Sequence, residues 1–193
     1  MDSALAEFSE QGYGASSVNT ICQAQGISKG IIYHYFNTKD ELFLACVEEC
    51  FCLLTEYLAK KSEVTAGDIT QQLEAYFTAR VEFFAKYPVY QRLFCEAVIS
   101  PPAHLKKKIQ ERKRPFDDLN IQILQQLLSC FPLNPQVTEK EVIETFRQFQ
   151  DFINARYQVR GLSVSEFEEH EERCRRALYI LLYGVIKREE LSL

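Results

Sequence analysis

The sequence predicts an all-α protein. Only 7 glycines and 6 prolines occur among 193 residues, whereas the strong helix formers Leu, Glu, Gln, Ala and Lys are plentiful. Apolar residues recur every three or four positions along most of the chain, and no alternating strand pattern precedes an Asn-Gly or Asp-Gly turn. We therefore expect helices along most of the chain. The turn and capping residues described next predict an N-terminal three-helix head of the helix–turn–helix type, and the rest of the chain is expected to form a larger helical body.

The first expected helix runs over residues 2–11. Ala4, Leu5 and Phe8 share one face of it, and Gly12 is expected to stop it. Together with residues from the next two helices, Phe8 is expected to form a small core, whose other members are Tyr13, Val18, Ile21, Ile32 and Phe36.

Two short helices joined by a tight turn are expected next. Ser16 or Ser17 can cap the first of them, and Gly26 suits the left-handed conformation that ends a helix. Ser28 can cap the second, which runs from Lys29 to about Tyr35. The apolar positions of the two helices are Val18, Ile21 and Ala24, then Ile32 and Phe36.

The stretch from Gly12 to Leu42 resembles the DNA-binding segment of the TetR family of transcriptional regulators. Its matches to the family pattern are Gly12, Tyr13, Ser17, Val18, Ile21, Gly26, Ser28, Lys29, Gly30, Tyr33, Tyr35, Phe36, Lys39 and Leu42, with Ile27 and Ile32 as conservative replacements. The resemblance covers about a quarter of the chain. It implies a ligand-responsive repressor that binds double-stranded operator DNA as a homodimer, with a DNA-binding domain over residues 1–48 and a ligand-binding and dimerisation domain over 49–193.

The resemblance also implies roles for individual residues. The side chains expected at base edges are Lys29, Ile31, Tyr33 and His34, and Gly30 would let the backbone approach the groove. Phosphates would be held by Ser16, Ser17, Tyr35 and Lys39, and Ser28 at the start of the recognition helix completes the predicted DNA-binding set.

The charge of the head supports a second hypothesis. Residues 1–48 hold six acidic residues against Lys29 and Lys39, whereas DNA-binding surfaces usually gain affinity from basic side chains. Family members often carry a basic stretch before the first helix, so either such a stretch precedes Met1 or DNA affinity is modest. The alternative is a dimeric helical ligand-binding or interaction protein whose DNA binding is weak or lost.

A long helix over residues 39–61 should connect the head to the body. Cys46 and Cys50 on its apolar stripe are interpreted as core residues, because four Cys or His ligands at zinc spacing do not occur nearby. A polar connection over residues 61–67 and helices over 68–86 and 89–100 should follow, the second ending before Pro101.

Residues 104–114, HLKKKIQERKR, carry six Lys or Arg residues and one Glu. They could contact DNA, but a solvated helix face is the favoured interpretation, because a body helix is expected to lie far from DNA. Pro115 is expected to restart the chain as the first turn of another helix, which continues to about Phe131.

Two closing helices are expected at the C-terminal end of the chain. Thr138 and Glu141 form a capping box that opens a helix to about Val159, and Gly161 should stop this helix. Ser163 or Ser165 should open the last helix, which runs to about Arg188. These helices suit a four-helix dimer interface of the kind the family uses. Its candidate residues are Phe146, Ile153, Tyr157, Ala177, Ile180, Leu181, Gly184 and Val185.

The body is also rich in aromatic residues. Those that could line a pocket for a small hydrophobic or planar ligand are Tyr76, Phe77, Phe83, Phe84, Tyr87, Tyr90, Phe94, Phe116, Phe149 and Phe152. Taken singly, each of them is more simply explained as a core residue.

Other function classes find no support in the sequence. It contains no Gly-rich phosphate loop, no G-x-S-x-G or H-E-x-x-H motif, and no metal-ligand spacing, so we expect neither an enzyme nor a cofactor. No signal peptide or membrane-length apolar run is present, and seven cysteines without a framework spacing suggest reducing cytoplasm.

Overall fold

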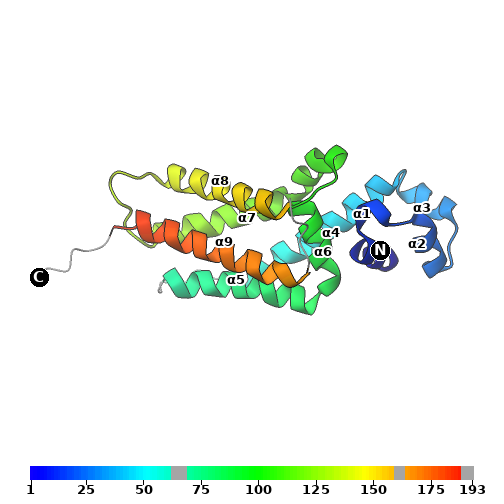
Figure 1. Ribbon diagram of the computed structural model, residues 1–193, viewed down its shortest axis with the longest axis horizontal. Coiled ribbons are helices and arrows are strands. Elements are labelled where there is room, and N and C mark those ends of the chain that lie inside the picture. Colours follow the sequence, from blue (N-terminus) through cyan, green and yellow to red (C-terminus); the bar gives the residue numbers. More distant parts are fainter. Residues whose placement is uncertain (62–68, 159–163, 188–193) are drawn as a thin grey trace, which may run out of the picture. The chain divides into compact units, whose positions relative to one another are not determined.

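The computed structural model describes residues 1–61, 69–158 and 164–187, and within these ranges the chain forms helices and no strand (Figure 1). Leu133 and Ile186 form an isolated bridge. The helices are α1 (Asp2–Ala15), α2 (Val18–Gln25), α3 (Lys29–Tyr35), α4 (Lys39–Lys61), α5 (Ile69–Lys86), α6 (Pro88–Val98), a 3₁₀ turn (Ala103–Leu105), α7 (Lys106–Ser129), α8 (Glu139–Gln158) and α9 (Val164–Val185). The predicted all-α class is confirmed. In the described part of the chain, no helix has the length and apolar character to cross a bilayer.

The chain divides into two compact units. Unit 1 comprises residues 1–57 and 81–116, and unit 2 comprises residues 58–80 and 117–193. Helices α4, α5 and α7 each contribute residues to both units. The predicted division into residues 1–48 and 49–193 stays a prediction, because unit 1 combines segments from both sides of that boundary.

Unit 1 has an aromatic core to which residues of the N-terminal head contribute. The rings of Phe8 and Phe43 lie 5.1 Å apart, and Phe51 packs between Phe94 and Phe116 at 5.9 and 5.6 Å. Helix α1 packs against both α2 and α6.

The two cysteines of α4 are core residues, as predicted. Cys46 and Cys50 are both almost completely buried in unit 1. Burial raises the pKa of the Cys46 thiol to about 12 and that of the Cys50 thiol still further. Neither side chain is therefore a ready nucleophile or a thiolate ligand at neutral pH.

Gly12 interrupts α1 but does not end it. Its φ of 73° lies in the left-handed region, and helical structure resumes as far as Ala15. The kink leaves the backbone N–H of Tyr13 free of the helical ladder, and the carboxylate of Glu96 on α6 accepts it at 3.0 and 3.1 Å. Arg92 of the same helix donates to the carbonyl of Glu10 at 2.7 Å. The predicted stop at Gly12 is thus corrected to a bend that α6 stabilises.

Pro115 lies inside α7, so the prediction that it starts a new helix is wrong. Ile109 and Phe116, seven residues apart, are both buried in unit 1 and lie on one face of a continuous helix. Burial of this face outweighs the hydrogen bond that a proline removes from a helix interior.

The capping box that opens α8 is confirmed. The Glu141 carboxylate accepts the Thr138 backbone N–H at 2.8 Å, and the Thr138 hydroxyl accepts the Glu141 N–H at 3.3 Å. Helices α8 and α9 lie side by side in unit 2 (Figure 1). The predicted connection over 61–67, the helix stop at Gly161 and the cap at Ser163 lie wholly or mostly outside the described residues.

Candidate nucleic-acid interface

Local backbone chemistry builds the turn between α2 and α3. The Ser17 hydroxyl caps α2 by accepting the N–H of Asn19 at 3.2 Å. Gly26 ends the helix in the left-handed conformation at φ 63°, and the N–H of Ile27 donates to the carbonyl of Cys22 at 3.1 Å. Ser28 occupies the cap position of α3, but its hydroxyl makes no capping hydrogen bond, contrary to prediction.

One side of α3 is buried, and the other presents large side chains to solvent. Ile32 is buried, whereas Ile31 is 47% exposed, Tyr33 41% and Tyr35 75%. Lys29, Gly30 and His34 are exposed as well. The predicted base-reading residues therefore share an accessible surface, as insertion into a DNA groove requires.

The predicted phosphate-binding residues are more constrained. Ser16 is buried, and its hydroxyl donates to the carbonyl of Tyr13 at 2.9 Å. The Lys39 ammonium donates to the Ser16 carbonyl at 2.7 Å and lies 4.7 Å from the centre of the Tyr13 ring. Ser16 and Lys39 thus fasten the start of α4 to the end of α1, and their phosphate-binding roles stay predictions.

A half-exposed polar network in unit 1 joins three elements at this junction. The Tyr13 hydroxyl donates to Asp40 at 2.5 Å and lies 3.1 Å from His104 Nε2, which is itself 3.3 Å from the Asp40 carboxylate. The hydrogen bond from Tyr13 lowers the pKa of Asp40, helped by His104. Burial and the same hydrogen bond raise the pKa of Tyr13 to about 12. We call these three residues the junction network.

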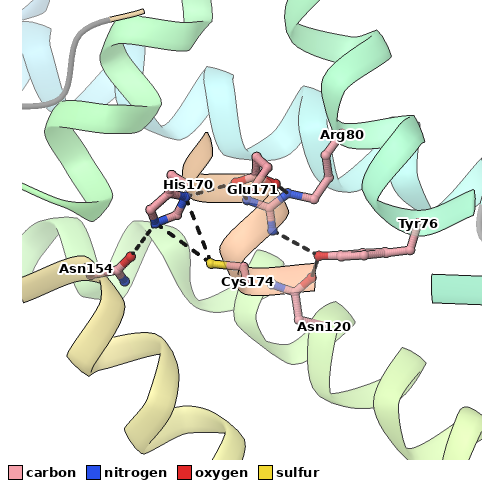
Figure 2. Close-up of polar contacts among 7 residues, drawn as sticks. All are labelled: Tyr76, Arg80, Asn120, Asn154, His170, Glu171 and Cys174. Carbon is pink, nitrogen blue, oxygen red and sulfur yellow. Dashed lines mark hydrogen bonds and ion pairs between the residues drawn. The ribbon is translucent and has the colours of Figure 1, made fainter. Parts of the chain in front are cut away.

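A second polar cluster, in which all side chains but those of Asn120 and Asn154 are buried, lies in unit 2 (Figure 2). It brings together side chains from α5, α7, α8 and α9, which are Tyr76, Arg80, Asn120, Asn154, His170, Glu171 and Cys174. We call them the buried polar cluster.

A bidentate ion pair is the centre of this cluster. Arg80 contacts the Glu171 carboxylate at 2.7 and 3.0 Å, and the two side chains are only 7% and 3% exposed. Burial alone lowers the pKa of Arg80, but the Glu171 carboxylate and the Tyr76 hydroxyl raise it above its ordinary value, so the guanidinium is charged. Such a pair is stable only while both charges are present.

The other side chains of the cluster surround the pair. The Tyr76 hydroxyl accepts from Arg80 at 3.2 Å and donates to Asn120 at 2.5 Å. His170 lies 3.3 Å from Glu171 through Nδ1 and 3.0 Å from Asn154 through Nε2 (Figure 2). Burial raises the pKa of Cys174 to about 12.

Of this cluster, only Tyr76 was predicted from the sequence to be a functional residue. The overlooked signal is the position of charged residues on apolar stripes. Arg80 lies four residues after Tyr76 on the buried face of α5, and Glu171 lies between Phe167 and Cys174 on the buried face of α9. A charge on such a face requires a partner, although the sequence does not show which one.

The predicted ligand-binding aromatics are divided between the two units. Phe83, Phe84, Tyr87, Tyr90, Phe94 and Phe116 belong to unit 1, whereas Tyr76, Phe77, Phe149 and Phe152 belong to unit 2. Most are buried, but Phe149 is 40% exposed and Phe152 is 64% exposed on α8.

Some of the predicted dimer residues are buried within the chain, and others are exposed. Phe146, Ile153 and Tyr157 are buried within one chain, and Ala177, Leu181 and Val185 are partly exposed. Ile180 is 58% exposed and Gly184 is exposed beside Tyr183, which is 55% exposed. The exposed apolar surface of α8 and α9 is therefore formed by Phe149, Phe152, Ile180 and Tyr183.

The geometry defines an all-helical protein with an N-terminal helix–turn–helix. Residues 1–46 match the family model described as bacterial regulatory proteins, tetR family. The match covers the N-terminal helices of the chain, including the helix–turn–helix.

Curated relatives match the N-terminal part of the chain. The TetC protein of transposon Tn10 from Escherichia coli is 33% identical over 67 residues, which are 35% of this chain and 34% of TetC. The transcriptional repressor AcnR of Corynebacterium efficiens is 30% identical over 104 residues, 47% of this chain and 55% of AcnR. The matched region thus spans about a third to a half of the length of these relatives.

Solved structures share the fold over nearly the whole chain. A transcriptional regulator FadR from Bacillus subtilis, in complex with stearoyl-CoA, superposes with a TM-score of 0.70 at 17% identity over 95% of this chain and 96% of FadR. FadR from Bacillus halodurans gives a TM-score of 0.67 at 17% identity over the same shares of the two chains. At such identities the likeness shows the fold alone.

Proposed function

We propose that this protein is a ligand-responsive transcriptional repressor that binds operator DNA as a homodimer. The observation that supports the proposal best is the helix–turn–helix, in which Ile31, Tyr33 and Tyr35 are exposed on α3 while Ile32 anchors the helix. Side chains of this size, left in solvent on a short helix, are explained by insertion into a major groove. The relatives that match this part of the chain include repressors. A catalytic role has no support in either polar network.

Two heads are needed to read an operator whose half-sites lie about one helical turn apart, roughly 34–36 Å. The exposed face of α8 and α9 is the proposed dimer interface, because Phe149, Phe152, Ile180 and Tyr183 leave apolar surface in water. This assignment transfers Phe149 and Phe152 from the predicted ligand pocket to the dimer interface. Phe146, Ile153 and Tyr157 would support that face from within the chain.

The proposed ligand is a small hydrophobic molecule that binds in the body. Ligand sites are mostly apolar with a few convergent polar groups, and Tyr76 combines an aromatic ring with a hydroxyl inside the buried polar cluster. A ligand that favours the non-binding arrangement of the two heads would release DNA. Stearoyl-CoA, which the Bacillus subtilis FadR structure contains, is a suitable first probe.

The test of DNA binding is fluorescence anisotropy with a duplex from upstream of the protein's own gene and a scrambled duplex of the same composition. We expect a preference for the upstream duplex that persists at physiological salt. Lys29→Ala should relax specificity at one base pair, whereas Lys140→Ala, at an exposed position on α8, should bind like wild type. Equal affinity of the wild-type protein for both duplexes would contradict the repressor function.

The test of the interface is sedimentation of Phe152→Glu and of the control Arg147→Glu, at an exposed position on another side of α8. We expect the first variant to sediment as a monomer and the second as a dimer, because only the first places a charge in apolar contact surface. A monomeric wild-type protein would contradict the proposed interface.

A further inference from the structure

The strongest positive charge in unit 1 lies outside the helix–turn–helix. Residues 106–114, which we call the basic segment, carry Lys106, Lys107, Lys108, Arg112, Lys113 and Arg114 against one acidic residue, Glu111. They form the first turns of α7.

The lysines at the start of the basic segment are exposed to solvent. Leu105 and Ile109 are each 1% exposed and hold the start of α7 against unit 1, so the three lysines between them lie in solvent. Arg112 reinforces the attachment by its 2.7 Å ion pair with Glu48 on α4. Lys106 and Lys107 have no ion-pair partner among the described residues.

The basic segment belongs to the same compact unit as the head. His104, two residues before Lys106, contacts Tyr13 and Asp40, and Asp40 directly follows Lys39 at the start of α4. The basic segment therefore begins next to the junction of α1 and α4, where phosphate contacts are expected. This placement removes the reason for interpreting it as a distant solvated face.

The charge balance of unit 1 shows what the segment contributes. Residues 1–57 hold eight acidic residues and only two basic ones, Lys29 and Lys39. Lys39 is already bonded to the Ser16 carbonyl. Residues 81–116 hold eight basic and three acidic residues, so they bring the net charge of unit 1 from −6 to −1. Binding to a polyanion depends on such charges, and the head alone is acidic.

We propose that the basic segment is a second DNA-contacting surface, which binds backbone phosphates beside the base pairs that α3 reads. Lys106 and Lys107 are the principal contacts, and these contacts are independent of sequence because phosphates carry no base identity. The proposal rests on the DNA-binding function proposed above. It explains how an acidic helix–turn–helix can bind DNA at all.

The test compares Lys106→Gln/Lys107→Gln with the control Lys140→Gln/Arg147→Gln, which removes the same charge from exposed positions of α8 in unit 2. Anisotropy is measured on the upstream duplex and on the scrambled duplex of the same composition, each of about 40 base pairs, over a salt series. We expect the first variant to lower the slope of log affinity against log salt by about 4 per bound homodimer on both duplexes. Each of the two lysines is lost from both protomers, and each phosphate contact contributes roughly 0.9. The control should keep the wild-type slope, and unchanged circular dichroism of both variants confirms folding.

The possible outcomes separate this proposal from the repressor function. A lowered slope without preference for the upstream duplex supports the basic segment and contradicts the repressor function. A retained preference with an unchanged slope overturns the basic-segment proposal alone. Failure of the wild-type protein to bind either duplex at low salt overturns both. An equal loss of slope in the control variant would show a general charge effect and would also overturn the proposal.

Discussion

The junction network of unit 1 and the buried polar cluster of unit 2 use similar side chains in different surroundings. Each contains a tyrosine hydroxyl, a histidine and a carboxylate, and in each the histidine contacts the carboxylate. Asp40 and His104 are 33% and 57% exposed, whereas Arg80 and Glu171 are 7% and 3% exposed. Water screens the first set of charges and is excluded from the second.

The difference in burial decides what each network contributes. An exposed network can be broken and re-formed at little cost, as suits a junction next to a DNA-reading head. A buried ion pair contributes little net stability, but losing one partner leaves a charge in an apolar interior. We therefore expect mutations in unit 2 to act on folding and mutations in the junction network to act mainly on local geometry.

The largest expected effect is that of Arg80→Met, which leaves Glu171 buried without its partner. We expect the free energy of unfolding to fall by about 3–5 kcal/mol, measured by urea denaturation. The control is Arg80→Met/Glu171→Leu, which removes both charges and should recover most of the loss. If Arg80→Met were as stable as wild type, the ion pair would have to be hydrated in the folded protein.

Glu96→Ala tests an intermediate degree of burial. The half-buried carboxylate accepts the Tyr13 N–H exposed by the kink at Gly12, so its removal should cost about 1.5–3 kcal/mol. Glu96→Gln keeps an acceptor oxygen and should cost less. Urea denaturation of both variants measures the difference, and equal losses would mean that the kink does not depend on this hydrogen bond.

Tyr13→Phe removes the hydroxyl of the junction network while keeping the ring that packs on Phe43. We expect the free energy of unfolding, measured by thermal denaturation, to fall by only about 0.5–1 kcal/mol, because Asp40 and His104 can form hydrogen bonds with water instead. A loss as large as that of Arg80→Met would contradict the contrast between the networks.

The smallest expected effect is a pH dependence at Asp40. Because Tyr13 and His104 lower the pKa of this carboxyl in the folded protein, its contribution is fully present above its ordinary value of 3.8 and is lost as pH falls below that value. Asp40→Asn should therefore be slightly less stable than wild type at pH 7, by about 0.5 kcal/mol, and equal to it in strong acid. Urea denaturation across this pH range measures the difference, and a gap that widens in acid would reverse the assigned sign.

Much of the local structure could be predicted from the sequence. The cap at Ser17, the left-handed Gly26 and the capping box at Thr138 depend on residues within a few positions of one another. The same holds for the helix–turn–helix and for the separation of Ile32 from the exposed side chains of α3. The sequence alone therefore determined the fold class, the start and end of most helices and the candidate DNA-reading surface.

Only the tertiary structure decided which distant residues meet. Arg80 pairs with a residue 91 positions away, and His104 reaches Tyr13 across the same separation. Helix α7 continues past Pro115 because one of its faces is buried. The packing of α8 leaves Phe152 exposed and buries Ile153. Periodicity shows that a helix has an apolar face but not what covers it. Burial and charge pairing depend on that covering, so they were settled by the fold.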